Sequence, residues 1–524
     1  MIRTRAAAGA SVPLLLLALA AVAVVLVPLG HVLVATATMD PAELGRLFWR
    51  PRVGELLGNT VGLLVAVVVT TTVLGVTAAW LVARTDLRGR LLWHALLAAP
   101  LAVPAFVNSY GWVSLTTAVQ SYAGAVLVIS LSYYPLVYLP VVGALASLEA
   151  APEEVARSLG RSHARAFLTA GLPRLVPAIL GGALLVGLHV LAEFGALQLL
   201  AFQTFTTAIY GQYESAFADD SGTVLAGVLV TLCVTLLLLE LVARGRRRLA
   251  RVGRSSARVP DPVVLRRSRP AVVLGLTGLV ALALGVPVYA LVRWMLIGSS
   301  TEFPLATLAS TLSTTLGLAL GGALLTTVMA LPLAWLAVRR RTALTTTLER
   351  AAYTANALPG VVVGLALVTV SIRVVPWLYQ TLPVLLVGYA VLFLPRALVS
   401  VRSSLEQAPP VLDEVSRSLG QSGAATFWRV TLPLVTPGVG TGAALVFLAV
   451  STELTATLML APTGTSTLAT QFWAASSEAR YGAAAPYALL LVLVSLPATI
   501  LLSRQAAPAR ERTSRVRFPE AVPA

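Results

Sequence analysis

The chain contains no lysine, and Cys233 is its only cysteine. A phosphate-binding P-loop requires a lysine that contacts the nucleotide phosphates, so any ATP-driven step needs a separate ATPase chain. A single cysteine excludes an intramolecular disulfide and a thiolate metal cluster. The four histidines, His31, His94, His163 and His189, are scattered with no pair at ligand spacing, so the sequence predicts no metal site and no cofactor.

Charged residues are also scarce, at 11% of the chain against about 25% in soluble domains, whereas hydrophobic residues make up 57%. A water-soluble fold is therefore excluded. A helix needs about 20 apolar residues to cross a bilayer, and we identify twelve apolar stretches, which begin near residues 13, 57, 92, 122, 175, 223, 271, 308, 352, 381, 435 and 483. We expect an all-α polytopic membrane protein with about 12 transmembrane helices. No nucleophile and base share a soluble site, so we expect neither catalytic residues nor an enzyme.

The net charge of +16 comes from arginine alone. The arginines flank the apolar stretches and concentrate in alternate loops, as the positive-inside rule predicts for cytoplasmic loops. We therefore expect a multi-pass protein of the bacterial plasma (inner) membrane with both termini in the cytoplasm. It contacts membrane lipid and has no nucleic-acid partner. Residues 244–269 are predicted to form a basic cytoplasmic linker, and residues 504–524 a basic cytoplasmic tail.

The two halves of the sequence repeat each other. Trp80, Pro104 and Pro140 recur 255 residues later, and Glu154, Gly160, Pro173 and Glu193 recur 260 residues later, as Trp335, Pro359, Pro395, Glu414, Gly420, Pro433 and Glu453. The sequence therefore predicts two halves, residues 1–243 and 270–503, with six spans each. Six is an even number, so the two repeats are parallel and their pseudo-two-fold axis runs along the membrane normal.

A short motif in a cytoplasmic loop of each half is the most informative pattern. In the loop at residues 149–173, acidic residues follow Pro152 at the start of a predicted helix, where the helix dipole favours negative charge. Gly160 then supplies a left-handed residue that ends this helix, and Ser162 caps the next one. Val155 and Leu159, four residues apart, share a face that fits a groove on a partner. The loop at residues 406–433 repeats this pattern.

This pattern resembles the EAA loop of binding-protein-dependent ABC permeases. The family pattern consists of E-A-A, three further residues, a glycine and, later in the loop, L-P. The resemblance implies a coupling helix that docks on an ATPase, two copies of an ABC ATPase subunit for the two loops, and an extracytoplasmic solute-binding protein. The coupling residues that it implies are Glu154, Val155, Ala156, Leu159, Gly160 and Pro173, with Glu414, Val415, Ser416, Leu419, Gly420 and Pro433. Val155, Val415 and Ser416 depart from the alanines of the family pattern, and Ala170 replaces its branched apolar residue.

Two alternatives remain open for this loop and for the chain. An amphipathic helix that only rests on lipid headgroups has a similar pattern. A secondary transporter of the major facilitator type also has twelve spans in two parallel halves. The loop Asp86–Arg90 partly matches the signature of that family, but its second-half counterpart, Arg339–Thr342, does not.

Glu193 and Glu453 are candidate residues of the translocation pathway. Each follows its loop proline by twenty residues, which places it about 30 Å along a helix, at the outer end of a span. Membrane carboxylates are costly and usually face a cavity or a partner, so a gate or a low-affinity cation contact is one interpretation. The other interpretation is a snorkelling side chain or a helix-end hydrogen bond to backbone near Gly195. If the first holds, the two carboxylates face each other across the pathway.

The residues around these two glutamates resemble those of fused ferric-iron permeases. The similar segments are Glu453–Leu458, Pro462, Gly464 and Thr467–Thr470, with Ala192–Gly195 and Thr206–Tyr210 in the first half. Thr455 and Ala461 depart from the family's proline and arginine. The resemblance implies import of ferric iron, and fused thiamine and phosphonate permeases share the architecture.

Overall fold

The computed structural model describes residues 12–146, 148, 151–216, 220–244, 262–298 and 300–506, and within them it is almost entirely helical. The described residues form no β-strand, and an isolated bridge joins Thr85 to Val263. Ten described helices are long and apolar enough to cross a membrane, and two bent helix pairs bring the number to twelve. These twelve segments match the twelve predicted stretches, which confirms the all-α polytopic prediction.

The contacts group the chain into two compact units, and each unit combines residues from both halves of the sequence. The first unit contains residues 1–56, 205–231 and 302–494. Its helices are α1 (Val12–Thr38), α2 (Pro41–Phe48), α12 (Phe205–Ala216), α16 (Leu305–Arg339), α17 (Ala343–Tyr353), α18 (Gly360–Arg373), α19 (Leu382–Gln407), α20 (Pro410–Ser418), α21 (Gly423–Thr426), α22 (Leu432–Ser451), α23 (Thr455–Leu460) and α24 (Leu468–Ser477). Helices α16, α19 and α22 pack against one another, and α1 packs against α16 and α18.

The second unit contains residues 57–204, 232–301 and 495–524. Its helices are α4 (Arg90–Ala98), α5 (Ala105–Val113), α6 (Tyr122–Tyr133), α7 (Pro135–Ala146), α8 (Ala151–Ser158), α9 (His163–Ala166), α10 (Leu172–Ala192), α11 (Gly195–Leu199), α14 (Arg269–Val280) and α15 (Val286–Ile297). Helices α3 (Pro51–Arg84), α13 (Asp220–Arg244) and α25 (Tyr481–Ala506) contain the boundaries between the units.

The first span of each half thus packs with helices of the other half. Helix α1 belongs to the unit built mainly from second-half residues, and α14 and α15 belong to the unit built mainly from first-half residues. Helix α15 approaches α5 closely, because a Cβ atom on Gly111 would lie 2.8 Å from the Cα of Pro287. The predicted boundaries at residues 243 and 270 divide the chain by its sequence repeat. The two packed units divide it differently, because each contains the first span of the other half. Most of the predicted linker and tail lies outside the described residues.

The third span of each half is bent rather than straight. Helices α4 and α5 meet at 89°, and α17 and α18 meet at 107°. The bends lie at Pro104 and Pro359, and the preceding residues, Val103 and Leu358, are extended with ψ of 109° and 106°. A proline disfavours helical backbone at the residue before it, so each proline ends one helix and starts the next at a new angle. Sequence analysis had placed a single apolar stretch at each position.

Candidate functional site

The first cytoplasmic loop motif folds as a short helix, a glycine turn and a second helix. Helix α8 ends at Ser158, and Gly160, two residues later, has a left-handed φ of +82°. The N–H of Gly160 donates to the Arg157 carbonyl at 2.9 Å, and the N–H of Arg161 donates to the Ala156 carbonyl at 3.2 Å. This is the hydrogen-bond pattern of a Schellman helix end. Ser162 Oγ accepts from the Arg165 N–H at 3.4 Å, so both the predicted glycine turn and the predicted cap are confirmed.

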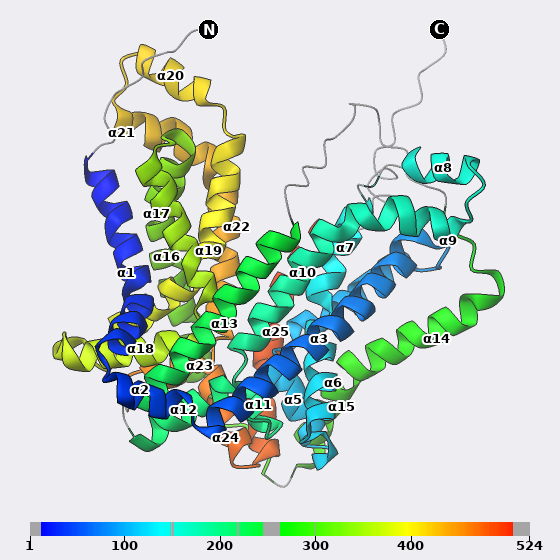
Figure 1. Ribbon diagram of the computed structural model, residues 1–524, viewed down its shortest axis with the longest axis horizontal. Helices are drawn as coiled ribbons and strands as arrows, with labels where there is room; N and C mark the ends of the chain where they lie inside the picture. Colours follow the sequence, from blue (N-terminus) through cyan, green and yellow to red (C-terminus); the bar gives the residue numbers. More distant parts are fainter. Residues whose placement is uncertain are drawn as a thin grey trace. The chain divides into compact units, whose positions relative to one another are not determined.

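The second copy of the motif adopts the same geometry. Gly420 also has a φ of +82°, and its N–H donates to the Arg417 carbonyl at 3.0 Å. The N–H of Gln421 donates to the Ser416 carbonyl at 3.2 Å, and Ser422 Oγ caps α21 at 3.2 Å. Within its own unit, α20 lies past the ends of α16, α19 and α22 (Figure 1). In both copies a π-helical segment, η3 (Phe167–Gly171) or η8 (Phe427–Thr431), joins the loop to the next span.

Each motif presents apolar side chains to the outside. Val155 is 58% exposed and Leu159 is 76% exposed, and their counterparts Val415 and Leu419 are 47% and 76% exposed. Glu154 and Glu414 are exposed beside them. Two large apolar side chains one helical turn apart form an unpaired surface that suits a groove on a partner protein.

The remaining predicted coupling residues lie elsewhere in the loop. Ala156 and Ser416 are buried, and Ser416 Oγ lies 3.0 Å from Thr426 Oγ1, so both face the inside of the loop. Pro173 and Pro433 occupy the first turns of α10 and α22. The structure therefore separates the exposed face of each motif from residues that hold the loop together.

A buried ion pair ties each short helix to the end of a long span, a feature that sequence analysis missed. Arg84 Nη2, at the end of α3, lies 2.6 Å from Glu153 Oε1. Its repeat counterpart Arg339, at the end of α16, has Nε 3.2 Å from Asp413 Oδ2. That second contact is an ion pair without hydrogen-bond alignment. The four side chains are only 6% to 15% exposed, so water screens these charges weakly.

The two ion pairs differ in the length of the acid and in the residue opposite it. Asp413, the shorter acid, accepts a hydrogen bond at 2.8 Å from Thr431 Oγ1. The first half has Gly171 at the position of Thr431, and a Cβ there would lie 2.7 Å from Glu153 Oε1 and 2.7 Å from Phe167 Cδ2. With the longer acid, a side chain at position 171 would displace the Glu153 carboxylate or the Phe167 ring, whereas the shorter acid leaves room for a threonine. Each half keeps the carboxylate in place with a different pair of residues.

The two glutamates of the candidate pathway sit at breaks between helices. Glu193 follows α10, and its Oε1 accepts from the Ala196 N–H at 2.9 Å, while the Tyr133 hydroxyl donates to Oε2. Glu453 follows α22, and its Oε1 accepts from the Ala456 N–H at 2.9 Å. The predicted helix-end hydrogen bond near Gly195 is therefore confirmed. It satisfies a backbone donor that the helix start leaves unpaired.

The surroundings of the two carboxylates are not equivalent. A Cβ on Gly360, at the start of α18, would lie 3.1 Å from Glu453 Oε1, and the charge of Arg396 on α19 attracts Glu453. The repeat counterparts of Gly360 and Arg396 are Ala105 and Val141. Among the described residues, no group of three or more His, Cys, Asp or Glu side chains is placed to hold a metal ion.

Comparison with known proteins places this geometry in a family. Residues 75–251 and 327–507 each match the family model described as binding-protein-dependent transport system inner membrane component. An Fe(3+)-transport system permease protein of Haemophilus influenzae is 38% identical over 92% of this chain and 96% of its own length. A ferric transport system permease protein of Actinobacillus pleuropneumoniae is 23% identical over 88% and 72%. A molybdenum transport system permease protein of Escherichia coli is 28% identical, but over only 34% of this chain.

Proposed function

The chain belongs to the family of binding-protein-dependent transport system inner membrane components, and from this premise we propose that it imports ferric iron as the fused permease subunit of an ABC transporter. Similarity to the Haemophilus ferric permease along nearly the whole of both chains carries this proposal. As a transport subunit it works with a binding protein and an ATPase. The molybdenum permease, by comparison, matches over 87% of its own length but over only 34% of this chain, at 28% identity.

We further propose that α8 and α20 are coupling helices, each docked on one of two copies of the ATPase. Their exposed apolar residues and acidic neighbours, repeated at the same spacing in both halves, support this role. This proposal requires both loops and both termini to be cytoplasmic. The arginines concentrate in these loops and near the termini, and arginine-rich segments favour the cytoplasmic side of the membrane. Thiol labelling of cysteines placed at positions 250 and 515 tests that orientation.

The transport proposal predicts ATP-dependent iron uptake. We expect a strain without other ferric importers to accumulate radioactive Fe³⁺ when this chain is produced together with its ATPase and its binding protein. An ATPase variant that binds but does not hydrolyse ATP is the matched control and should reduce uptake to background. Accumulation of molybdate instead of iron by the same strain would overturn the choice of solute while leaving the permease assignment intact.

We also propose that Glu193 and Glu453 face the translocation pathway, where their charge acts on the passing solute. Glutamine keeps an oxygen that accepts from the Ala196 or Ala456 N–H, so Glu193→Gln with Glu453→Gln removes charge and retains the helix-end hydrogen bonds. We expect about a tenfold loss of uptake with an unchanged melting temperature. The double alanine variant, which removes the hydrogen bonds as well, is the control for stability. Normal uptake in the double glutamine variant would leave these residues with a structural role alone.

A further inference from the structure

The last described part of the linker, from residue 262 to Arg269, is attached to the end of α3. Val263 N–H donates to the Arg84 carbonyl at 2.8 Å, and Asp86 N–H donates to the Val263 carbonyl at 3.1 Å. These two hydrogen bonds form the isolated bridge between Thr85 and Val263. They satisfy both the N–H and the carbonyl of Val263.

Asp86 holds the same segment through its side chain. Its Oδ1 accepts from the Leu265 N–H at 2.9 Å, and its Oδ2 pairs with the Arg269 guanidinium. The hydrogen bond from Leu265 is the main cause that keeps the pKa of the Asp86 carboxyl below its usual value, and the charge of Arg269 acts in the same direction. Asp86 is therefore ionised at neutral pH. We call the contacts of Val263, Leu265 and Arg269 with residues 84–86 the linker clasp.

The linker clasp reaches the first short helix through one residue. Arg84 accepts from Val263 with its backbone carbonyl and pairs with Glu153 of α8 through its side chain. Thr85 and Leu87 on either side of Asp86 are buried, as is Leu265. A displacement of the linker segment therefore moves the backbone of Arg84, whose side chain pairs with Glu153 of α8.

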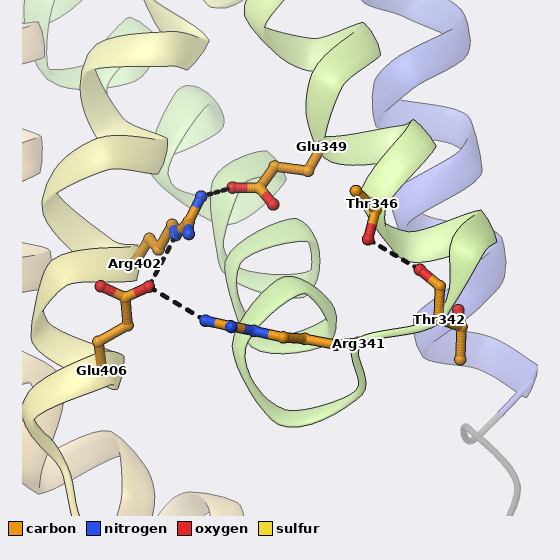
Figure 2. A network of polar contacts seen from close by, with 6 residues as sticks. All are labelled: Arg341, Thr342, Thr346, Glu349, Arg402 and Glu406. Carbon is orange, nitrogen blue, oxygen red and sulfur yellow. Dashed lines mark hydrogen bonds and ion pairs between the residues drawn. The ribbon is translucent and has the colours of Figure 1, made fainter. Parts of the chain in front are cut away.

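In the second half, the segment that follows α16 is held by helices of its own half instead. Arg341, the repeat counterpart of Asp86, has Nη2 3.7 Å from Glu406 Oε1 of α19. Glu406 also pairs with Arg402 at 3.0 Å, and Arg402 pairs with Glu349 of α17. Figure 2 shows these four side chains as one network that joins the start of α17 to the end of α19. Within the part of the chain that the structure describes, the network draws on no linker residue.

We propose that the linker clasp positions the first coupling helix, so that Asp86, Val263 and Arg269 are positioning residues for α8 and not for α20. This inference rests on the proposed coupling function of the two loops. The linker then has two roles: it connects the two halves of the chain, and it positions one of the two coupling helices. The two coupling loops, alike in their exposed faces, then differ in what holds them.

The test compares the two loops with one reporter in each. In a Cys233→Ala background, a spin label is attached to a cysteine at position 155 or at position 415, both exposed positions in equivalent loops. Asp86→Ala should increase the mobile fraction of the label at 155 by about twofold or more and leave the label at 415 unchanged. Arg341→Ala, the repeat-equivalent control, should leave the label at 155 unchanged.

Two further variants separate positioning from a general loss of fold. Asp86→Asn keeps an acceptor for Leu265 and loses the charge that pairs with Arg269, so it should lie between the wild type and Asp86→Ala. Exchange of the charges by Asp86→Arg with Arg269→Asp restores the ion pair but leaves the Leu265 N–H without its acceptor, so it should recover the immobile label only in part. A label at 155 that stays immobile in Asp86→Ala, or that is mobilised equally by Arg341→Ala, overturns the proposal.

The spin-label measurement needs neither the ATPase nor a solute, so it stands even if the transported solute is not iron. With the ATPase bound, Asp86→Ala should also raise the ATP hydrolysed per solute imported by about twofold or more, because one loop then transmits motion less reliably. If the label is mobile but the ATP hydrolysed per solute imported is unchanged, the positioning role of the linker clasp is overturned. If the ATPase does not bind the wild-type chain, the coupling function on which the positioning proposal rests is overturned instead.

Discussion

Gly160→Val combined with Gly420→Val is expected to abolish solute uptake while the permease still inserts and folds. Both glycines have a φ of +82°, a conformation that costs an L-residue about 1–2 kcal/mol and a β-branched residue more. No heavy atom lies within 4 Å of a Cβ placed at either glycine, so the backbone conformation alone is disturbed. Valine must either adopt this conformation or redirect α8 and α20. Uptake and recovery of the ATPase in a detergent pull-down measure the result.

Gly423 provides the matched control for this variant. It lies three residues after Gly420 in a helical conformation, with open space around its Cβ position, and the first half already has His163 there. Gly423→Val should therefore retain uptake and ATPase binding. Each single variant, Gly160→Val or Gly420→Val, should be intermediate. Normal uptake by the double variant with the ATPase still bound would mean that the loops are interfacial helices without a coupling role.

Gly171→Thr is expected to disable the first coupling loop, and Glu153→Asp is expected to restore it. The threonine Cβ would lie 2.7 Å from Glu153 Oε1 and so push that carboxylate away from Arg84. Breaking a buried ion pair typically costs about 3–5 kcal/mol, because one charge is left unpaired. Glu153→Asp shortens the acid, and the pair then reproduces the Asp413–Thr431 arrangement of the second half. Melting temperature and uptake of the four proteins give a double-mutant cycle.

The cycle has a clear expected sign. The double variant should be more stable than the sum of the single effects by about 0.5–3 kcal/mol, the range found for residues in contact. The reciprocal exchange in the second half, Asp413→Glu with Thr431→Gly, should show a coupling of the same sign. Additive effects in both halves would show that the acid and the residue opposite it are independent.

Local patterns allowed much of the coupling loops to be predicted, because their geometry depends on residues close in sequence. The left-handed Gly160 and the cap at Ser162 follow from residue type and spacing, and the helix-end bond of Glu193 involves a donor three residues away. The Arg84–Glu153 pair joins residues 69 positions apart, and no periodicity specifies which arginine meets which acid. In the sequence, Asp86 partly matches the signature of another transporter family, whereas its partners in the fold lie about 180 positions away.

For the bent third spans, too, the sequence predicts the local feature but not the geometry that depends on distant residues. Pro104 and Pro359 were recognised as repeated residues, but hydropathy reports only that a stretch is apolar and long enough to cross. The angles of 89° and 107° depend on what the following helices pack against. Helix α18 packs against α23, and α5 packs against α11, and both partners follow much later in the chain.

Because the first spans are exchanged, α1 is synthesised well before the second-half helices against which it packs. Helix α1 packs against α16 and α18, and about 270 residues separate the end of α1 from the start of α16. At about 5–20 residues per second, a ribosome needs roughly 15–55 s to deliver that partner. Throughout this interval the packing face of α1 meets lipid or the insertion machinery. A ribosome that stops within the linker therefore leaves α1 without α16 and α18, its neighbours from the second half.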